Sequence, residues 1–369
     1  MKKLAIIGAS YLQLPLVLKA NEMGLETHCF AWEEGAVCKE VADYFYPVSI
    51  LEKEQILQIC QQVAIDGITT IASDAAVPTV CFVAGNMGLT GNAFEDALVA
   101  TDKYLMRQRF AEFSVSSPRF VIADNSYSID NFRFPIIVKP TDRSGSRGVK
   151  KIEKSEELNK AVERAQKESF TQKAIIEEYI SGREVSVETI SWKGKHYILA
   201  ITDKVTTEEP YFVELEHHQP SNLPADIQLK IKSETLKALA ALNINYGASH
   251  AEFKITSEGE VFAIEVGARM GGDFIGSHLV RLSTGYDFVK GVIDVSLGHF
   301  EEPVLNNKDC SGVYFLCKET EYLLPVIQKA GDYKEIVESE ITDSELHAIQ
   351  CSADRSGYLI YQAQKRFML

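Results

Sequence analysis

The stretch from residue 250 to 272, HAEFKITSEGEVFAIEVGARMGG, constrains the fold most, because its pattern predicts a β-hairpin. Gly259 is free to adopt positive φ in the tight loop between the two strands. Apolar residues alternate with polar ones on both sides of this loop: Ala251, Phe253, Ile255, Phe262, Ile264 and Val266. The hairpin is therefore expected to have an apolar face that contains Phe253 and Ile264, and an opposite polar face.

Two glutamates are predicted to face each other across this hairpin. If Glu258 and Gly259 form a two-residue loop, the register places Glu252 opposite Glu265 on the polar face. Opposed carboxylates repel, so one is protonated or a cation lies between them. Hard carboxylate oxygens, completed by water and phosphate oxygens, are typical of a magnesium site, and Arg269 is placed to hold an anion beside it. The alternative is a solvated hairpin with ordinary surface charges.

Length, charge and cysteine content exclude several classes of protein. The chain has 369 residues, which suggests two or three domains. Its net charge of −14 argues against nucleic acid and anionic membrane surfaces as partners. No run of about 18 apolar residues is present, so no membrane span is expected, and the apolar start is too short for a signal peptide. Seven cysteines without a Cys-x-x-Cys pair indicate reduced thiols and a cytoplasmic location.

The first hundred residues alternate between strands and helices, which predicts a parallel α/β sheet. Strands are expected over 4–7, 25–32, 46–48 and 67–72, with helices over 12–23 and 53–62. The turn at 8–10 lacks the full glycine-rich dinucleotide fingerprint, so a plain tight turn is favoured there. Ser73 and Asp74 end the fourth strand, where such sheets place ligand contacts, although a helix N-cap explains the pair equally well.

A lysine and a polar loop suit the binding of a polyphosphate. Lys139 stands near the end of a β-type segment, 134–140, that Pro140 terminates. The next residues, TDRSGSRGV at 141–149, contain two glycines, two serines and two arginines. Glycines permit close backbone approach, hydroxyls and amides donate, and arginines neutralise charge. The segment is no Walker A motif, and an ordinary surface loop is the alternative.

Acidic strands follow this loop. Residues 174–180 and 183–190 read as strands, and the second places Glu184 and Glu188 on one polar face, which needs solvent, cations or a hydroxyl-rich ligand. The loop 208–224 is long and aromatic, as functional or disordered loops are. A helix is expected over 226–242, with one or two more over 273–297. The tail, 310–369, shows short strands and a helix without readable chemistry.

Taken together, five motifs resemble the ATP-grasp superfamily over about residues 1 to 300. Each motif alone is weak, and their order makes the set specific. They are Thr101-Asp102-Lys103; Ile137-Val138-Lys139-Pro140 with the loop 144–148; the segment 176–184, IEEYISGRE; His250-Ala251-Glu252-Phe253-Lys254; and the segment 264–272, IEVGARMGG. The segments 203–204, 211–218 and 269–273 most resemble the carboxylate–amine ligase branch that includes L-amino-acid ligases, and the N-terminal part resembles carbamoyl-phosphate-synthetase-like proteins.

The resemblance implies a site for ATP. Lys103 and Lys139 would hold the α- and β-phosphates, and the glycine- and serine-rich loop would close over the β- and γ-phosphates. Glu177 would accept a hydrogen bond from the adenine amino group, and Glu184 would bind the ribose hydroxyls. The remaining residues assigned to ATP are Ser144, Gly145, Ser146, Gly148, the hinge residues Glu178, Tyr179 and Ile180, and Lys204.

The resemblance also implies a magnesium site and a substrate site. Glu252 and Glu265 would ligate Mg²⁺, and Arg269 would act with Lys139 in catalysis. Substrate contacts are assigned to Arg269, Gly271, Gly272, Glu214 and His218. One departure is Gly267, where many members carry an asparagine that is a further metal ligand. Its absence leaves Glu252 and Glu265 to hold the metal without a third side chain.

The implied fold combines α/β and α+β parts. An N-terminal parallel α/β domain (1–100), called the pre-ATP-grasp domain, precedes two α+β ATP-grasp subdomains (101–185 and 186–300) and a small C-terminal α+β module (301–369). The implied activity is ATP- and Mg²⁺-dependent ligation of a small-molecule carboxylate to an amine through an acyl phosphate, with release of ADP and phosphate. Amino acids are the candidate substrates. The alternatives are a bicarbonate-phosphorylating enzyme of the carboxylase or carbamoyl-phosphate type, and an ATP-binding regulatory protein without turnover. No nucleic-acid or membrane partner is expected, and a homodimer is left open.

Overall fold

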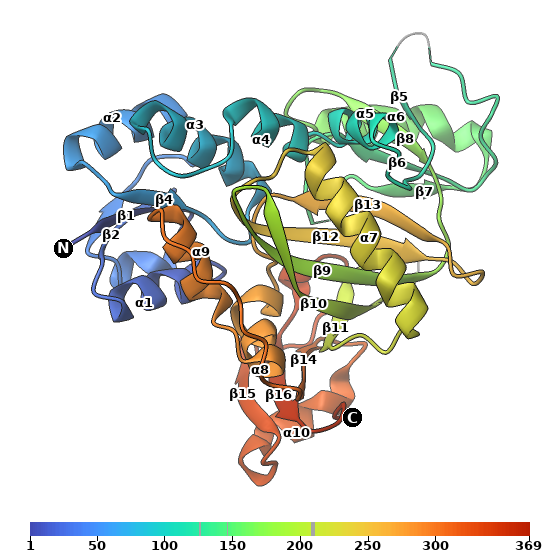
Figure 1. The fold of residues 1–369 in the computed structure, drawn as a ribbon. Helices are drawn as coiled ribbons and strands as arrows, with labels where there is room; N and C mark the ends of the chain where they lie inside the picture. Colours follow the sequence, from blue (N-terminus) through green and yellow to red (C-terminus); the bar gives the residue numbers. More distant parts are fainter. Residues whose placement is uncertain (125–126, 146, 208–210) are drawn as a thin grey trace.

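The computed structural model describes all residues of the chain except 125–126, 146 and 208–210. The strands within the described ranges form three sheets, a parallel one and two antiparallel ones. The parallel sheet comes first in the chain and lies beside the larger antiparallel sheet, on the left in Figure 1. The combination of α/β and α+β parts predicted from the sequence is therefore confirmed. In the part of the chain that is described, no helix is long and apolar enough to cross a membrane.

The N-terminal sheet has the strand order β3-β2-β1-β4 and is covered on both faces. Its strands are β1 (Lys3–Ile7), β2 (Glu26–Phe30), β3 (Tyr44–Tyr46) and β4 (Gly67–Thr69). Successive β1 residues enter different cores, with Leu4 and Ile6 on one face and Ala5 and Ile7 on the other. The first face packs on α1 (Leu14–Glu22) and α9 (Phe288–Ser296), and the second on α2 (Lys53–Val63) and α3 (Val77–Met87). The third strand ends before Pro47, which has no N–H to donate.

The smaller antiparallel sheet contains the lysine-bearing strand. Its order is β5-β8-β6-β7, with β5 (Phe120–Ile122), β6 (Ile136–Pro140), β7 (Lys150–Ile152) and β8 (Ala174–Glu178). Helix α6 (Leu158–Glu168) packs on it through Leu158, Ala161, Val162 and Ala165, which is the stripe that the sequence predicts. Helices α4 (Phe94–Thr101) and α5 (Lys103–Glu112) lead to this sheet from the N-terminal one.

The larger antiparallel sheet has eight strands in the order β13-β12-β9-β10-β11-β14-β16-β15. They are β9 (Arg183–Trp192), β10 (Lys195–Thr206), β11 (Glu214–Gln219), β12 (Gly247–Ile255), β13 (Val261–Gly267), β14 (Cys310–Leu316), β15 (Ile336–Ile341) and β16 (Gly357–Ala363). Helix α7 (Ala225–Ala241) packs on β9, β12 and β13. The C-terminal residues thus extend this sheet through the β11–β14 pairing. The described residues also form a π-helix, Ile275–Leu279, and the short helices α8 (Val280–Thr284) and α10 (Leu324–Gln328), besides several 3₁₀ turns.

The hairpin β12–β13 pairs Glu252 with Glu265, as predicted, although its loop and the pairing next to the loop differ from the prediction. Its loop is longer than two residues, and Ile255 pairs with Val261 rather than with Phe262. A β-bulge shifts the register by one residue between Glu252 and Phe253, so Glu252 still lies opposite Glu265. The bulge also changes which β13 residues are buried: these are Val261, Ala263 and Val266, so the prediction of an apolar Phe262 and Ile264 face is wrong.

Candidate active site

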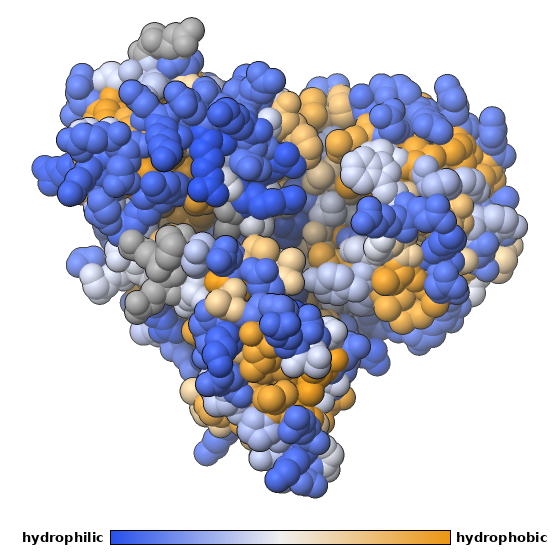
Figure 2. All heavy atoms as spheres, turned by 180° about the vertical axis from the view of Figure 1, so that it is seen from behind, coloured by the Kyte–Doolittle hydropathy of each residue, from blue (hydrophilic) through white to orange (hydrophobic). Residues whose placement is uncertain are grey.

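Hydrogen bonds and an ion pair bring parts of the three sheets together. The Ala72 N–H, which follows β4, donates to Met270 O at 3.0 Å, and the Lys103 N–H donates to Thr141 O at 2.7 Å. Lys103 Nζ also lies 2.8 Å from Glu265 of β13, so the segments that follow β4 and β6 both lie near the end of β13. Seen from behind, the surface is hollowed between the parts of the molecule (Figure 2). Most of the predicted site residues come from the strands and segments around this junction.

Lys103 lies at the start of α5, where Asp102 caps the helix by accepting from the N–H groups of Tyr104 and Leu105. Its Nζ is 2.8 Å from Oε1 of Glu265 and donates to Arg143 O at 2.6 Å. Burial alone lowers the pKa of Lys103, but the Glu265 carboxylate outweighs it and the pKa is raised. Lys103 is therefore a buried cation that touches both the polar loop and one predicted metal ligand.

Lys139 is held by a carboxylate that has a second cationic partner. Its Nζ lies 2.6 Å from Oε2 of Glu177, and Arg107 Nε lies 2.9 Å from Oε1 of the same side chain. All three side chains are nearly inaccessible to solvent. Burial lowers the pKa of Lys139, and it remains lowered despite Glu177. Arg107 was not predicted, because in the sequence it resembles any other helix arginine. It also donates to Ile264 O at 2.6 Å, next to Glu265.

The predicted adenine hinge and phosphate loop lie at the ends of β8 and β6. Glu178 ends β8 and its N–H donates to Arg119 O at 2.9 Å, so this amide is not free for adenine. Tyr179 follows, with Lys151 Nζ 4.5 Å from its ring centre, and then Ile180. In the loop, Gly148 has φ +73°, and a Cβ there would lie 2.8 Å from Pro140. Ser144 and Gly145 also lie in this loop, and the predicted Ser146 lies outside the described residues.

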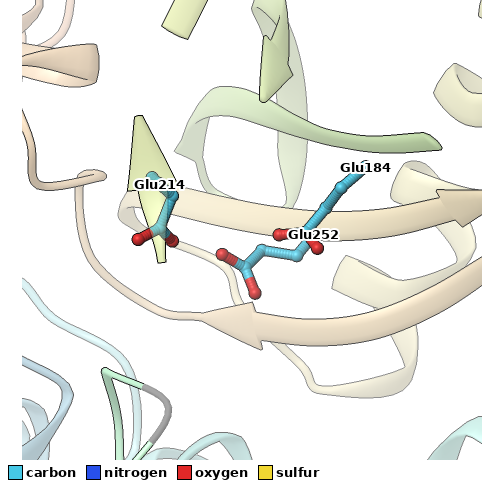
Figure 3. Close-up of side chains that lie close together, drawn as sticks. All are labelled: Glu184, Glu214 and Glu252. Carbon is cyan, nitrogen blue, oxygen red and sulfur yellow. The ribbon is translucent and has the colours of Figure 1, made fainter. Parts of the chain in front are cut away.

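Three glutamates surround Lys204. Its Nζ lies 2.6 Å from Glu184, 2.7 Å from Glu252 and 3.3 Å from Glu214. Figure 3 shows these carboxylates turned toward one another, and one oxygen of each lies within 4.8 Å of the others. Burial lowers the pKa of Lys204, yet the three carboxylates raise it well above its usual value. The group could hold a metal by its geometry, but here an ammonium neutralises it.

Glu252 and Glu265 have different cationic neighbours. Glu252 contacts Lys204 at 2.7 Å and His250 Nε2 at 3.4 Å, whereas Glu265 contacts Lys103. Burial raises the pKa of Glu252, but Lys204 and His250 hold it well below its usual range. The repulsion expected from two opposed carboxylates is thus offset by cationic side chains, and both remain available as hard oxygen donors.

Arg269 pairs with a residue of the N-terminal part. Its Nη2 lies 2.7 Å from Oδ2 of Asp74. Burial alone lowers the pKa of the guanidinium, and Asp74 raises it. The alternative interpretation of the Ser73–Asp74 pair as an N-cap is correct in position only, because Ser73 precedes the 3₁₀ helix Asp74–Ala76 but makes no side-chain cap bond. A Cβ atom at Gly267 would lie 2.5 Å from Asp74 Oδ1, so this pair leaves no room for a side chain at 267.

Backbone hydrogen bonds fix the segment that contains the predicted substrate residues Gly271 and Gly272. The Gly271 N–H donates to Glu188 Oε2 at 3.0 Å, so this amide is not free for a substrate carboxylate. Glu188 also makes a short contact with His250 Nδ1. Gly272 O accepts from the Ile275 N–H at 2.9 Å, where the chain turns into the π-helix. The sequence placed Glu188 on the polar face of its strand but gave it no role in the site.

His218 faces the core rather than the carboxylate cluster. It is 1% exposed, and its ring nitrogens bond to Tyr361 at 2.9 Å and Glu216 at 2.8 Å. Its assignment to substrate is therefore corrected. His217 instead lies opposite Lys204 in the ladder, and its Nε2 is 4.0 Å from Asp273. Strand alternation could have identified it if the range of β11 had been known.

The C-terminal residues add Arg355 to the candidate site, and this residue was also not predicted. Its guanidinium lies 2.9 Å from Asp273, and it donates to Glu214 O at 2.9 Å. It stacks 3.7 Å from the centre of the Phe315 ring. Arg355 therefore joins the C-terminal strands to the segment that follows Gly272, and nothing in its sequence neighbours indicates this contact.

The donor chemistry of the assembled residues fits Mg-ATP. Glu252 and Glu265 offer the hard carboxylate oxygens that magnesium takes. Lys103 and Lys139 are the kind of cationic donor that holds phosphates. Among the described residues, the buried Nε of Arg269 has no hydrogen-bond partner, which leaves a donor for an anion.

Comparisons with known proteins agree with the motifs. Residues 132–277 match the model of the family described as the ATP-grasp domain. The D-alanine–D-alanine ligase of Geobacter sulfurreducens is 26% identical over 184 residues, 48% of this chain and 57% of that protein. Dapdiamide A synthase of Enterobacter agglomerans is 26% identical over 269 residues, 64% of this chain and 62% of that protein. The chain thus spans less than two thirds of the length of either relative.

Solved structures share the fold over nearly the whole chain. The L-amino acid ligase from Bacillus licheniformis has a TM-score of 0.81 at 22% identity, over 99% of this chain and 94% of that one. The phosphoribosylglycinamide synthetase from Anaerococcus prevotii has a TM-score of 0.77 at 22% identity, with the same coverage of 99% and 94%. At this identity the likeness shows the fold alone. The match of residues 132–277 to the ATP-grasp domain model confirms the resemblance to the ATP-grasp superfamily.

Proposed function

We propose that this chain is an ATP- and Mg²⁺-dependent ligase that joins a small-molecule carboxylate to an amine, with amino acids as the favoured substrates. The observation that carries the proposal is the junction of the three sheets, where Lys103, Lys139 and Arg269 lie near the opposed pair Glu252 and Glu265. Relatives named as ligases of D-alanine and as dapdiamide A synthase support the reaction class. A cytoplasmic location and a homodimer stay predictions.

A carboxylate needs activation before an amine can attack it. Transfer of the γ-phosphoryl group onto a carboxylate oxygen gives an acyl phosphate, whose phosphate leaves when the amine attacks the carbonyl carbon. The products are an amide, ADP and phosphate. Mg²⁺, when bound by Glu252 and Glu265, would neutralise phosphate charge. Metal ions and cationic side chains are effective here because the surroundings are largely buried.

The residues of the chain have distinct tasks in this reaction. Lys103 and Lys139 hold the phosphates of ATP, and the loop 141–149 covers them. Arg269 holds the substrate carboxylate and then the charge that develops on it, because a guanidinium offers several donors in a fixed plane. Hydrolysis of the acyl phosphate is limited when water is excluded from the site.

A substrate screen tests the proposal. The chain is incubated with Mg-ATP and pooled carboxylic acids and amines, and both ADP release and product mass are measured. Amide formation supports the ligase. ADP release that depends on bicarbonate alone favours a carboxylase or carbamoyl-phosphate type of enzyme. ATP binding without turnover favours a regulatory protein.

A matched variant tests the metal assignment within this reaction. Glu265→Gln keeps the size of the side chain but removes the charge that magnesium requires. The amide product should be lost while the variant stays folded, with a lower Tm because buried Lys103 loses its charged partner. Full activity of this variant contradicts the assignment of Glu265.

A further inference from the structure

Glu177 lies between two cationic side chains. Its Oε2 is 2.6 Å from Lys139 Nζ, and its Oε1 is 2.9 Å from Arg107 Nε. Arg107 is 0% exposed, Glu177 2% and Lys139 6%, so water screens these charges little. Each oxygen of the carboxylate therefore faces a different cation, in a place where unit charges act strongly on one another.

This group of three side chains carries more positive than negative charge. Burial raises the pKa of Glu177, but Arg107 and Lys139 lower it on balance, which keeps the carboxylate ionised. The guanidinium of an arginine stays protonated in proteins. Paired with Lys139 alone, the Glu177 carboxylate would balance the whole charge of the ammonium. With Arg107 on its other oxygen, one positive charge is left over for an anion.

Arg107 is fixed in place by α5 and β13. Lys103 and Arg107 are one helical turn apart in α5, so both project from the same face of the helix. Lys103 Nζ lies 2.8 Å from Glu265, and Arg107 Nη2 donates to Ile264 O at 2.6 Å. The guanidinium is thus tied to β13 by one nitrogen and faces Glu177 with another. Its position beside the carboxylate therefore does not depend on a bound nucleotide.

We propose that Arg107 is a positioning residue for phosphate binding: it occupies one side of the Glu177 carboxylate and so leaves the Lys139 ammonium available to the phosphates of ATP. This inference rests on the proposed function, since the role of Lys139 comes from it. Arg107 acts through Glu177 and does not itself touch the nucleotide. The alternative is a structural role, in which the arginine only ties α5 to Ile264.

Nucleotide binding without turnover separates the two roles. A non-hydrolysable ATP analogue with Mg²⁺ is titrated into the full chain, and its Kd is measured by calorimetry. Arg107→Gln keeps a donor for Ile264 O but removes the charge, so the Kd should rise about tenfold. Arg107→Lys keeps the charge but loses the planar fork, so the Kd should stay within about twofold. The reverse order, with the lysine variant weak and the glutamine variant unchanged, overturns the proposal.

A second variant tests whether Arg107 acts through Glu177. Glu177→Gln removes the negative charge that competes for Lys139, so in this background Arg107→Gln should raise the Kd of the analogue by less than about threefold. An equal tenfold loss in both backgrounds overturns the proposal, because the arginine would then act on the phosphates by its own charge. Arg109→Met, a change at a partly exposed arginine of the same helix, is the control and should leave the Kd unchanged.

Steady-state kinetics give a further reading. Arg107→Gln should raise the KM for ATP about tenfold and leave the KM for the carboxylate within about twofold, whereas equal rises of both overturn the proposal. If the glutamine variant does not fold, the lysine variant decides: retained affinity for the analogue supports the proposal, and a tenfold loss overturns it. If the variants bind the analogue as expected but the unchanged chain forms no amide with any substrate, the proposed function fails while the role of Arg107 in phosphate binding stands.

Discussion

The Glu188 carboxylate accepts a hydrogen bond from the Gly271 N–H at 3.0 Å and also contacts His250 Nδ1. Glu188 is fully buried in β9. A Cβ atom at position 271 would lie 2.6 Å from His250 Nδ1, so the backbone at 271 packs directly on this pair. His250 Nε2 in turn lies 3.4 Å from Glu252. The pair thus links a predicted metal ligand with the segment that follows Arg269.

Glu188→Ala should raise the KM for the carboxylate substrate and lower kcat. The Gly271 N–H loses its acceptor, so the segment beside Arg269 is no longer held in one position, whereas the contacts of Lys139 do not change. The KM for ATP should therefore remain within about twofold, against a change of about tenfold for the carboxylate. Steady-state kinetics with each substrate varied in turn measure the difference.

Glu188→Gln is the matched control, since its side-chain oxygen can still accept from the Gly271 N–H. It should recover part of the loss seen in the alanine variant. An equal rise of both KM values, or a glutamine variant no better than alanine, would contradict a positioning role.

Lys204→Ala should destabilise the chain and at the same time create a cation site. Removal of one partner of a buried ion pair costs about 3–5 kcal/mol, and here the ammonium lies within 3.3 Å of all three carboxylates. Without the ammonium, the carboxylates of Glu184, Glu214 and Glu252 repel one another unless another cation binds between them. Thermal unfolding should show a lower Tm that rises again when MgCl₂ or CaCl₂ is added.

Lys204→Arg serves as the control for that experiment, because it keeps a positive charge in the cluster. Its Tm should respond to divalent cations no more than that of the unchanged chain. A Tm of Lys204→Ala that is independent of divalent cations would show that the three carboxylates do not form such a site.

Local patterns were sufficient to predict much of this molecule. The parallel N-terminal sheet follows from alternation of strand and helix, and the buried stripe of α6 follows from its 3.6-residue period. The opposition of Glu252 and Glu265 was predicted correctly although its loop was not, because a bulge offsets the longer loop. A bulge has no reliable sequence signal, so the buried face of β13 could not be assigned.

Contacts between distant segments could not be predicted. Asp74 meets Arg269, and Arg355 meets Asp273, although the members of each pair are far apart in the sequence, and no local pattern encodes such contacts. The wrong assignment of His218 has a simpler cause. Neighbouring residues of a strand face opposite sides, so an uncertain strand range leaves the choice between them open.

Arg355→Met should raise the KM of the carboxylate or the amine without changing that of ATP. The guanidinium holds Asp273 at 2.9 Å and the Glu214 backbone, two groups that flank the predicted substrate loop, and it touches none of the ATP residues Lys103, Lys139 or Glu177. Methionine keeps the stacking on Phe315 but loses the charge. An effect of about tenfold in KM is expected, equivalent to about 1.4 kcal/mol.

Lys318→Met, a change at an exposed lysine of the same C-terminal part, is the control for Arg355→Met. It should leave all three KM values unchanged. If the KM for ATP rises as much as the others in Arg355→Met, the arginine supports the whole junction and not the substrate side alone.

Stability in acid should depend on Asp203, which ties the C-terminal residues to β10. Its carboxylate accepts from Ser221 and from the Asn222 N–H at 3.0 Å, and it pairs with Arg366 at 2.7 Å. Burial raises the pKa of Asp203, but these partners lower it below its ordinary value of about 3.9. A carboxyl whose pKa is lower in the folded state stabilises it above the unfolded pKa, and this contribution is lost as pH falls through the folded pKa.

Asp203→Asn should therefore lower the free energy of unfolding at pH 7 by about 1–3 kcal/mol, the range for a hydrogen-bonded buried charge. The difference between the variant and the unchanged chain should persist down to about pH 4 and shrink below it, because the aspartate then becomes protonated and loses its charge as well. Denaturant unfolding at a series of pH values measures this difference. Arg366→Met should reproduce part of the loss at pH 7, since it removes one of the same contacts. A difference that grows as pH falls would contradict the ion pair as its source.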